Sequence, residues 1–237
     1  MIAFLMGMFF STQAADHVKG NGKLSTKKIT IDDFNAIKFD GVIDFNYEQS
    51  ESTPHIEITV DENLHPYVNI DIQDRVLTVG FKGAKVDHFT KFIVKTNSKW
   101  LKEVKASGNA NSNCLVQLKQ KVEVGKLDLN VSGSANMVVN ELKTDKLECS
   151  INGSGTINLK AGNAEEADYS ITTDGEIMAF GVAVPEVNCK ITGKGSAQIH
   201  PTDNLKATIV GKGNIRYKGP TAVQQKVIGK GTVEEVK

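Results

Sequence analysis

Arginine, net charge and long apolar runs are what this 237-residue sequence has least of. Its 28 Lys and Arg balance 28 Asp and Glu, and Arg75 and Arg216 are the only arginines. Duplex nucleic acid and anionic membranes need a concentrated basic footprint, and bidentate phosphate recognition relies on arginine. The longest apolar run, at residues 2–10, is too short to span a bilayer. We therefore predict no nucleic-acid partner and no transmembrane segment in the mature chain.

Cysteine and histidine are also scarce, which limits metal chemistry. Cys114, Cys149 and Cys189 are widely spaced and form no Cys-x-x-Cys motif. The histidines lack metal-ligand spacing; they are His17, His55, His65, His88 and His200. A structural zinc site needs four clustered ligands. We predict no metal and no cofactor, and we expect the cysteines to be small buried core residues.

The N-terminal residues have the pattern of an export signal. The apolar run at 2–10 has the length of a signal-peptide core, and Thr12 and Ala14 are small residues placed for cleavage before Ala15. No basic residue precedes the run, which departs from the usual pattern. We predict a signal peptide at 1–14 and a flexible mature N-terminus at 15–26. The protein is then expected to be periplasmic, outer-membrane-associated or extracellular.

Glycine is abundant, with 21 residues against 5 prolines, and much of it lies in a repeat. Seven segments share one pattern around an anchor position, and successive anchors are 18–25 residues apart. The anchors are Gly108, Gly133, Gly153, Thr173, Gly193, Gly211 and Gly229. A period near twenty in strand-rich sequence is typical of a solenoid.

Alignment of the repeats produces columns of apolar and small residues. Two positions before the anchor lie Ala106, Val131, Ile151, Ile171, Ile191, Ile209 and Val227. Four positions after it lie Ser112, Met137, Ile157, Ile177, Ala197, Ile215 and Val233. Six positions before it lie Leu127, Leu147, Ala167, Val187, Leu205 and Val223. The column two positions after the anchor holds only Ala110, Ala135, Gly155, Gly175, Gly195, Gly213 and Gly231. Since alternate residues of a strand share a face, these columns point inward, and the small column forms the inside of a corner.

The pattern predicts an all-β protein whose residues 104–237 form a single-stranded, right-handed parallel β-helix of about seven coils. A leucine-rich repeat is the alternative, but it requires a helical period that the repeats lack. Cys149 and Cys189 fall in one column two coils apart, about 9–10 Å, which is too far for a disulfide.

Residues 27–103 alternate apolar and polar positions in short runs separated by turn signals, one of which is a tight hairpin at Gln73–Arg75. We predict an antiparallel or mixed β cap over one end of the helix. No linker separates the two parts, so 27–237 is expected to be one continuous domain.

The order of motifs resembles a known family. The sequence has Phe34-x-x-Ile37, Gly41-Val42, a strand at 55–60, Asp74-Arg-Val-Leu-Thr-Val79, and repeated Ser/Asn-Gly-Ser-Gly/Ala units at 132–135 and 152–155. This is similar to the bacterial exported family of putative auto-transporter adhesins, head GIN domain, over about residues 27–218. The resemblance implies a β-helical body, export to the envelope or surface, and no established catalytic residues.

Two groups of side chains are candidates for ligand contact. Lys194, Lys212 and Lys230 follow successive anchors and are expected to form a ladder of cations, a docking stripe for an anionic glycan. Asp174 and Glu176 form the best outward acidic cluster, with Glu165 and Glu166 in a predicted loop before it.

We expect a non-catalytic exported protein, an adhesin or an envelope or surface binding protein, whose partner is a surface glycan or an envelope component. The alternative is a carbohydrate-active enzyme, a polysaccharide lyase or hydrolase on the same scaffold. A hydrolase needs two carboxylates facing one cleft, so a cleft beside Asp174 with a second carboxylate would favour the enzyme.

Overall fold

The computed structural model describes residues 16–108 and 114–236, and strands make up 74% of the chain against 3% helix. The predicted signal peptide at 1–14 lies outside the described residues, as do Ala110 and Ser112 of the first repeat. The all-β prediction is confirmed.

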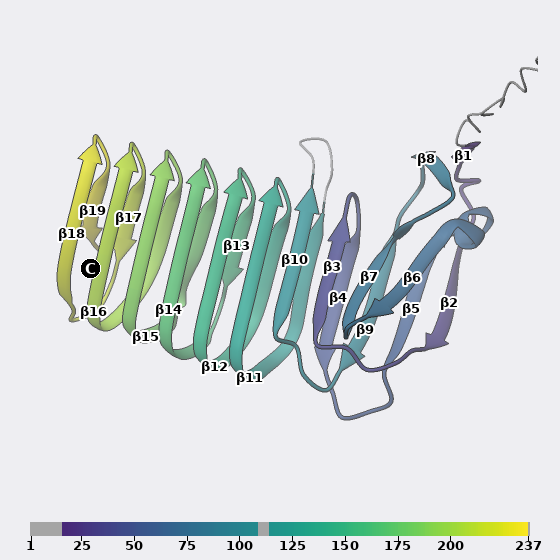
Figure 1. Cartoon of the computed structure of the whole chain (residues 1–237), viewed down its shortest axis with the longest axis horizontal. Coiled ribbons are helices and arrows are strands. Elements are labelled where there is room, and N and C mark those ends of the chain that lie inside the picture. The colour runs from purple at the N-terminus through teal and green to yellow at the C-terminus, as the bar shows by residue number, and fades with distance from the viewer. Residues whose placement is uncertain (1–15, 109–113, 237) are drawn as a thin grey trace, which may run out of the picture.

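The larger part is a parallel β-solenoid of about six turns, close to the seven coils expected from the sequence. Its coils stand side by side in a single row (Figure 1). Its strands are β10 (Glu103–Gly108), β11 (Leu115–Gly133), β12 (Asn136–Gly153), β13 (Thr156–Leu159), β14 (Gly162–Thr173), β15 (Glu176–Gly193), β16 (Ser196–Gly211), β17 (Asn214–Tyr217), β18 (Ala222–Gly229) and β19 (Thr232–Glu235).

The register between coils is the one predicted from the columns. Ile171 pairs with Ile151 in the coil before and with Ile191 in the coil after. The anchors pair in the same way, from Gly108 with Gly133 to Gly211 with Gly229. Because the coils pair in parallel and these columns stay in register, their like residues lie about 4.8 Å apart along the solenoid.

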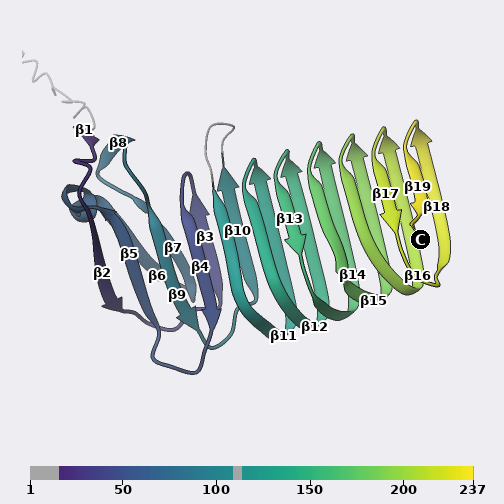
Figure 2. The same cartoon turned by 180° about the vertical axis from the view of Figure 1, so that it is seen from behind.

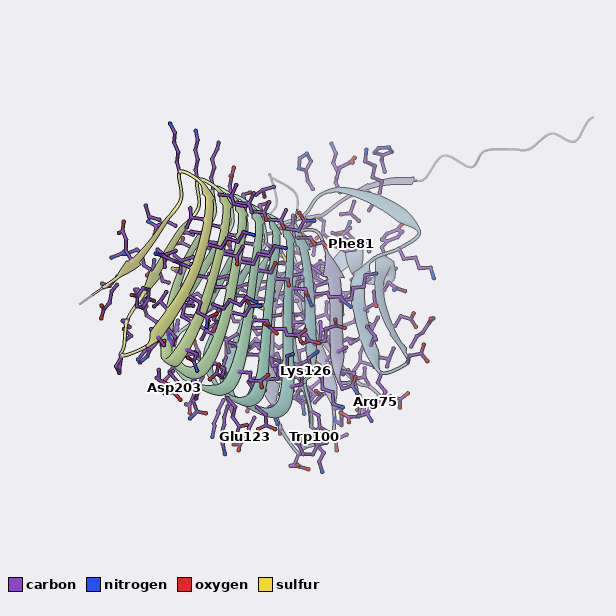
Figure 3. All side chains as sticks on the ribbon, turned by 60° about the vertical axis from the view of Figure 1, so that its left-hand side comes forward. Arg75, Phe81, Trp100, Glu123, Lys126 and Asp203 are labelled. Carbon is purple, nitrogen blue, oxygen red and sulfur yellow. The ribbon has the colours of Figure 1, made fainter. Side chains whose placement is uncertain are left out.

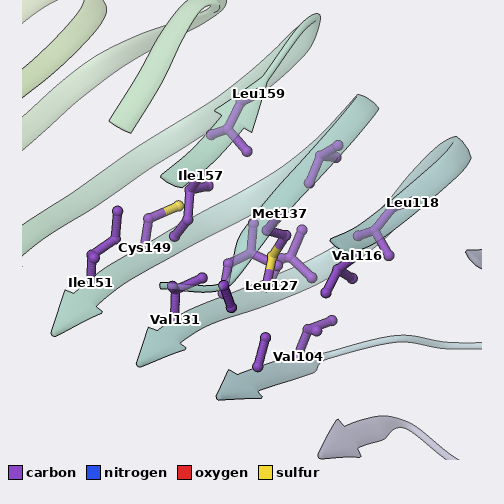
Figure 4. Packing of buried hydrophobic residues seen from close by; sticks show 14 of the residues in the cluster. Val104, Val116, Leu118, Leu127, Val131, Met137, Cys149, Ile151, Ile157 and Leu159 are labelled. Carbon is purple, nitrogen blue, oxygen red and sulfur yellow. The ribbon is translucent and has the colours of Figure 1, made fainter. Parts of the chain in front are cut away.

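The columns fill the solenoid with apolar side chains. Ile151, Ile157 and Leu127 are at most 2% exposed, and residues of neighbouring coils pack into a continuous core (Figure 4). Most of the outward residues between them are polar, with Val210 and Ile228 as exposed apolar exceptions, so the alternation along each strand separates core from water.

The anchor position needs a left-handed backbone. Gly193 has φ +122°, and a Cβ there would lie 2.5 Å from the carbonyl oxygen of Thr173. Thr173, the one anchor that is not glycine, adopts φ 85° and donates its hydroxyl to the carbonyl of Gly153 at 2.7 Å. That bond offsets part of the strain of a β-branched residue in this region.

The two cysteines of one column are separated by a tyrosine. Tyr169 pairs with Cys149 on one side and Cys189 on the other, and all three are at most 2% exposed. Burial raises the pKa of Cys189 to about 12 and also raises that of Cys149. Both thiols therefore stay protonated and unreactive at neutral pH, as predicted for core cysteines.

The hydroxyl of Tyr169 has no hydrogen-bond partner within the described residues. Tyr169→Phe is therefore expected to raise the free energy of unfolding by about 1 kcal/mol, because it removes an unsatisfied buried polar group. Tyr47 is the matched control, since its equally buried hydroxyl contacts Ser98 Oγ at 3.0 Å. Tyr47→Phe should lower the free energy of unfolding in the same urea titration. A loss of stability in both variants would contradict the prediction.

The N-terminal part is a cap of shorter strands and one 3-10 helix, at the end of the row opposite β18 and β19 (Figure 2). Its elements are β1 (Asp16–Lys19), β2 (Leu24–Thr30), β3 (Ala36–Asp40), β4 (Asp44–Gln49), β5 (His55–Asp61), η1 (Glu62–Tyr67), β6 (Val68–Gln73), β7 (Val76–Phe81), β8 (Ala84–His88) and β9 (Ile93–Ser98). No helix in the described ranges is long and apolar enough to cross a membrane.

The cap is mixed, and part of it continues the solenoid. β2 pairs antiparallel with β5, whereas β3 and β4 pair parallel with β10 and β11. The parallel stack continues beyond them, since β3 also pairs parallel with β7 and β4 with β9, so it extends into the segment 27–103 that the sequence assigned to the cap. The hairpin at 73–76 joins β6 and β7 as expected, with Asp74 and Arg75 both at positive φ.

The segment 15–26, predicted to be flexible, contains β1 and the start of β2. Asp61 ties it to the cap by accepting hydrogen bonds from Gly22 N at 2.7 Å and from Thr90 N at 2.7 Å. Burial alone raises the pKa of the Asp61 carboxyl, but these donors outweigh it and hold the pKa below its ordinary value. Side chain to backbone bonds of this kind are not visible as a sequence pattern.

Candidate ligand-binding surface

The three predicted lysines stack along the edge where each coil turns. The backbone N–H of Lys194 donates to Thr173 O at 2.9 Å, that of Lys212 to Gly193 O at 2.7 Å, and that of Lys230 to Gly211 O at 2.7 Å. Each lysine thus occupies the same position in successive coils, and all three side chains are exposed. We call these residues the lysine row.

Within the part of the chain that the structure describes, one carboxylate is in line with the lysine row, because Asp174 holds the same position in the coil before Lys194. None of its three ammonium groups takes part in an ion pair or a hydrogen bond there. Like charges in neighbouring strands repel one another, so the row is electrostatically unfavourable by itself.

Asp174 and Glu176 lie beside the row, and neither lines the two hollows described below. The N–H of Asp174 bonds Gly153 O at 3.2 Å, which places Asp174 in the coil before Lys194. Glu176 opens β15 between Thr156 and Ser196, where Gln198 Nε2 lies 3.4 Å from its Oε1. The neighbours of Glu176 in the coils on either side, Thr156 and Ser196, are neutral and polar.

A groove of about 490 Å³ lies elsewhere, along β14, β15, β16 and β18. Two outward rows flank a floor of buried residues: Glu166, Glu186, Asn204 and Ala222 on one side, Asp168, Asn188, Lys206 and Gln224 on the other, with Ala167, Val187 and Leu205 between them. Of the residues that the sequence singled out, Glu166 lines this groove, whereas Lys194, Lys212, Lys230, Asp174 and Glu176 do not. Glu166 belongs to β14, so the expectation that it lies in a loop was wrong.

The same two rows are closed by ion pairs in the preceding coils. Lys126 Nζ lies 3.2 Å from Asp128 Oδ1 and 3.1 Å from Glu148 Oε1. Lys146 Nζ lies 3.3 Å from Glu148 and 3.4 Å from Asp168. The hydrogen bond from Lys126 lowers the pKa of Glu148. Figure 3 labels Lys126 on the outer face of the coils.

The groove opens where the row that contains Lys126 and Lys146 continues with glutamates, at Glu166 and Glu186. A glutamate at position 166 or 186 cannot pair with an aspartate across the gap. The bonds that remain run along each row, from Asn188 Nδ2 to Asp168 at 3.2 Å and from Asn204 Nδ2 to Glu186 at 2.7 Å. The polar lining of the groove therefore consists of carboxylates, amides and the Lys206 ammonium group, all of which can hydrogen-bond sugar hydroxyls.

A second hollow of about 320 Å³ lies over the cap, where His55, Glu57, Lys95 and Lys119 contribute to its lining. Within the described ranges, no cluster of three or more His, Cys, Asp or Glu side chains is arranged to hold a metal ion.

The chain resembles three crystal structures along nearly its whole length. A putative adhesin from Parabacteroides merdae ATCC 43184 is 93% identical, with a TM-score of 0.81, and the match covers 94% of this chain and all of that one. A putative adhesin from Parabacteroides distasonis ATCC 8503 is 65% identical, with a TM-score of 0.79 and coverage of 93% and 100%. A putative lipid binding protein from the same strain is 29% identical, with a TM-score of 0.79 and coverage of 94% and 100%. No curated protein matches the chain.

The family match extends over residues 33–220, which takes in most of the cap and the solenoid as far as β17. This agrees with the resemblance drawn from the motif order and the repeats. The chain belongs to the family described as putative auto-transporter adhesin, head GIN domain.

Proposed function

We propose that this protein is exported and acts as a non-catalytic binding protein of the cell envelope or surface, with an anionic glycan as its ligand. The family and the adhesin names of the two relatives from Parabacteroides support a surface-binding role. The lysine row is the observation that carries the choice of ligand.

Three lysines at one position of successive coils make a straight line of positive charge about 5 Å from step to step. A linear polymer with regularly spaced carboxylates or sulfates can contact every step of such a line. Binding also relieves the repulsion within the row, since each anion neutralises a cation that has no partner in the folded chain.

An anionic lipid surface has related chemistry, and one relative is named a putative lipid binding protein. Peripheral membrane binding combines basic residues with apolar side chains that enter the acyl boundary. The residues after the lysines are Gly195-Ser196, Gly213-Asn214 and Gly231-Thr232, which offer no such side chains. Two positions before Lys212 and Lys230, however, Val210 and Ile228 are 39% and 54% exposed. The reason to choose a glycan is therefore the regular spacing of the charges, and the lipid arm of the experiment below tests the other ligand class.

The triple variant Lys194→Gln, Lys212→Gln, Lys230→Gln tests the proposal. We expect it to elute from an immobilised anionic polysaccharide at clearly lower salt than the parent, because three charge contacts are lost. A second column that carries anionic lipid vesicles distinguishes the two ligand classes. The proposal would be contradicted if the triple variant were retained on the polysaccharide as strongly as the parent. It would also be contradicted if the variant lost retention only on the vesicle column.

The groove supplies a matched control and tests the enzyme alternative. Glu186→Gln removes a charge from the groove and leaves the lysine row intact, so retention on the polysaccharide should not fall. The same samples can be examined for chain length of the polysaccharide. Shortening by the parent but not by Glu186→Gln would favour a hydrolase that uses groove carboxylates; we expect no shortening by either.

A further inference from the structure

The last coil presents an open sheet edge. β18 pairs with β16 and β19 pairs with β17, and no described residue pairs with the other side of either strand. The two strands form the end of the row opposite the cap, and Figure 3 turns this end toward the viewer. As a result Val227 is 38% exposed, whereas Ile209, its counterpart one coil earlier, is fully buried.

The inward columns become polar in this coil. Gln225 takes the position held by Ala207 in the coil before, and Glu235 takes the position held by Tyr217. Next to these polar residues, Val227 and Val233 continue the apolar columns. The exposed end is therefore a patterned surface of apolar, amide and acidic side chains around free backbone donors and acceptors.

This surface is complementary to itself. The turn centred on Lys230 joins the two strands, so 225–227 (Gln-Lys-Val) and 233–235 (Val-Glu-Glu) lie at equal distances from it along the chain. A two-fold axis that runs parallel to the strands and passes through the end face places β18 of one copy beside β19 of the other. The chains are then antiparallel, which is the orientation that sheet edges pair in most readily.

We propose that the open edge formed by β18 and β19 docks a second copy of the same chain, in an isologous dimer that joins the two solenoids end to end. In this register Val227 faces Val233 of the partner subunit and closes the apolar column. Lys226 faces Glu234 of the partner subunit on the outer wall, and Gln225 faces Glu235 of the partner subunit inside.

Complementary charge is the reason to choose a second copy over an unrelated strand. The pair of Lys226 with Glu234 of the partner subunit forms on one wall of the junction. The two-fold axis repeats the same pair on the other wall. An exposed β edge with apolar residues such as Ile228, which is 54% exposed, is otherwise a site of uncontrolled association. Pairing with a second copy covers both strands at once, so this end of the solenoid keeps no free edge.

Sedimentation velocity of the purified protein over a concentration series tests the proposal. Lys226→Glu and Glu234→Lys each set like charges against each other at two places, and each is expected to raise the dimer dissociation constant about tenfold or more. An equimolar mixture of the two variants restores opposite charges at both places, so it should dimerise like the parent. This rescue requires that the two residues face each other across the junction.

Lys190→Glu is the matched control, because Lys190 occupies the same outward column two coils before Lys226. It should leave the dissociation constant unchanged, and all variants should keep the parent's melting temperature to show that they fold. A parent that is monomeric up to roughly 100 μM, where weak specific dimers are populated, would overturn the proposal. Charge reversals that do not affect association, or a mixture that fails to restore it, would do so as well.

Discussion

Ile171→Asp is expected to lower the free energy of unfolding by roughly 3–5 kcal/mol, because it places an unpaired charge in a dry column. Ile171 is 1% exposed and lies between Ile151 and Ile191 of the neighbouring coils. No cation reaches this column, whose members are apolar on both sides. Urea denaturation followed by circular dichroism measures the loss.

Thr172→Asp is the matched control for that substitution. Thr172 is the next residue, it points outward, and it is exposed, so its replacement should change the stability by no more than about 0.5 kcal/mol. The pH dependence offers a second check. Burial raises the pKa of the new carboxyl in the folded state, so Ile171→Asp should regain stability as the pH falls through that pKa. Equal stabilities of Ile171→Asp and the parent would contradict the inward orientation of this column.

Gly195→Val is expected to lower the free energy of unfolding by about 1–3 kcal/mol or more, because it overpacks the inside of the corner. A Cβ at Gly195 would lie 2.5 Å from Ile171 Cγ2 and 2.7 Å from the carbonyl oxygen of Gly175. The carbonyl belongs to the backbone of the adjacent coil and cannot rotate away. Positive φ does not contribute here, because the left-handed position in each coil is the anchor and not the small column.

Gly195→Ala and Lys194→Val complete this experiment. The alanine variant introduces only the clashing Cβ and should fall between the parent and Gly195→Val. Lys194 is exposed and one residue away, so Lys194→Val adds the same side chain on the outside of the wall and should be nearly neutral. Melting temperatures that are equal for Gly195→Val and Lys194→Val would show that Gly195 does not face the core.

The lysine row and the groove differ in how much of each the sequence could predict. Lys194, Lys212 and Lys230 recur beside the anchors, so their alignment follows from the repeat alone. The groove depends on a change within two rows, from Lys126 and Lys146 to Glu166 and Glu186. An alignment of those two rows would have revealed the change from lysine to glutamate. The open space, however, also depends on which side chains extend from one row to the other, and only the packed structure shows that.

The register of the solenoid was determined by the sequence itself, since every coil repeats the same alternation of inward and outward residues and a one-residue slip would bury polar side chains. The positions of Ile171, Gly195 and the cysteine column all followed from that local rule. Only the tertiary structure decided that β3 and β4 stack on β10 and β11 and that Asp61 holds the N-terminal segment. These features depend on contacts between segments far apart in the chain, whose pairing is selected by the packing of the whole cap and solenoid and leaves no periodic signal in either segment.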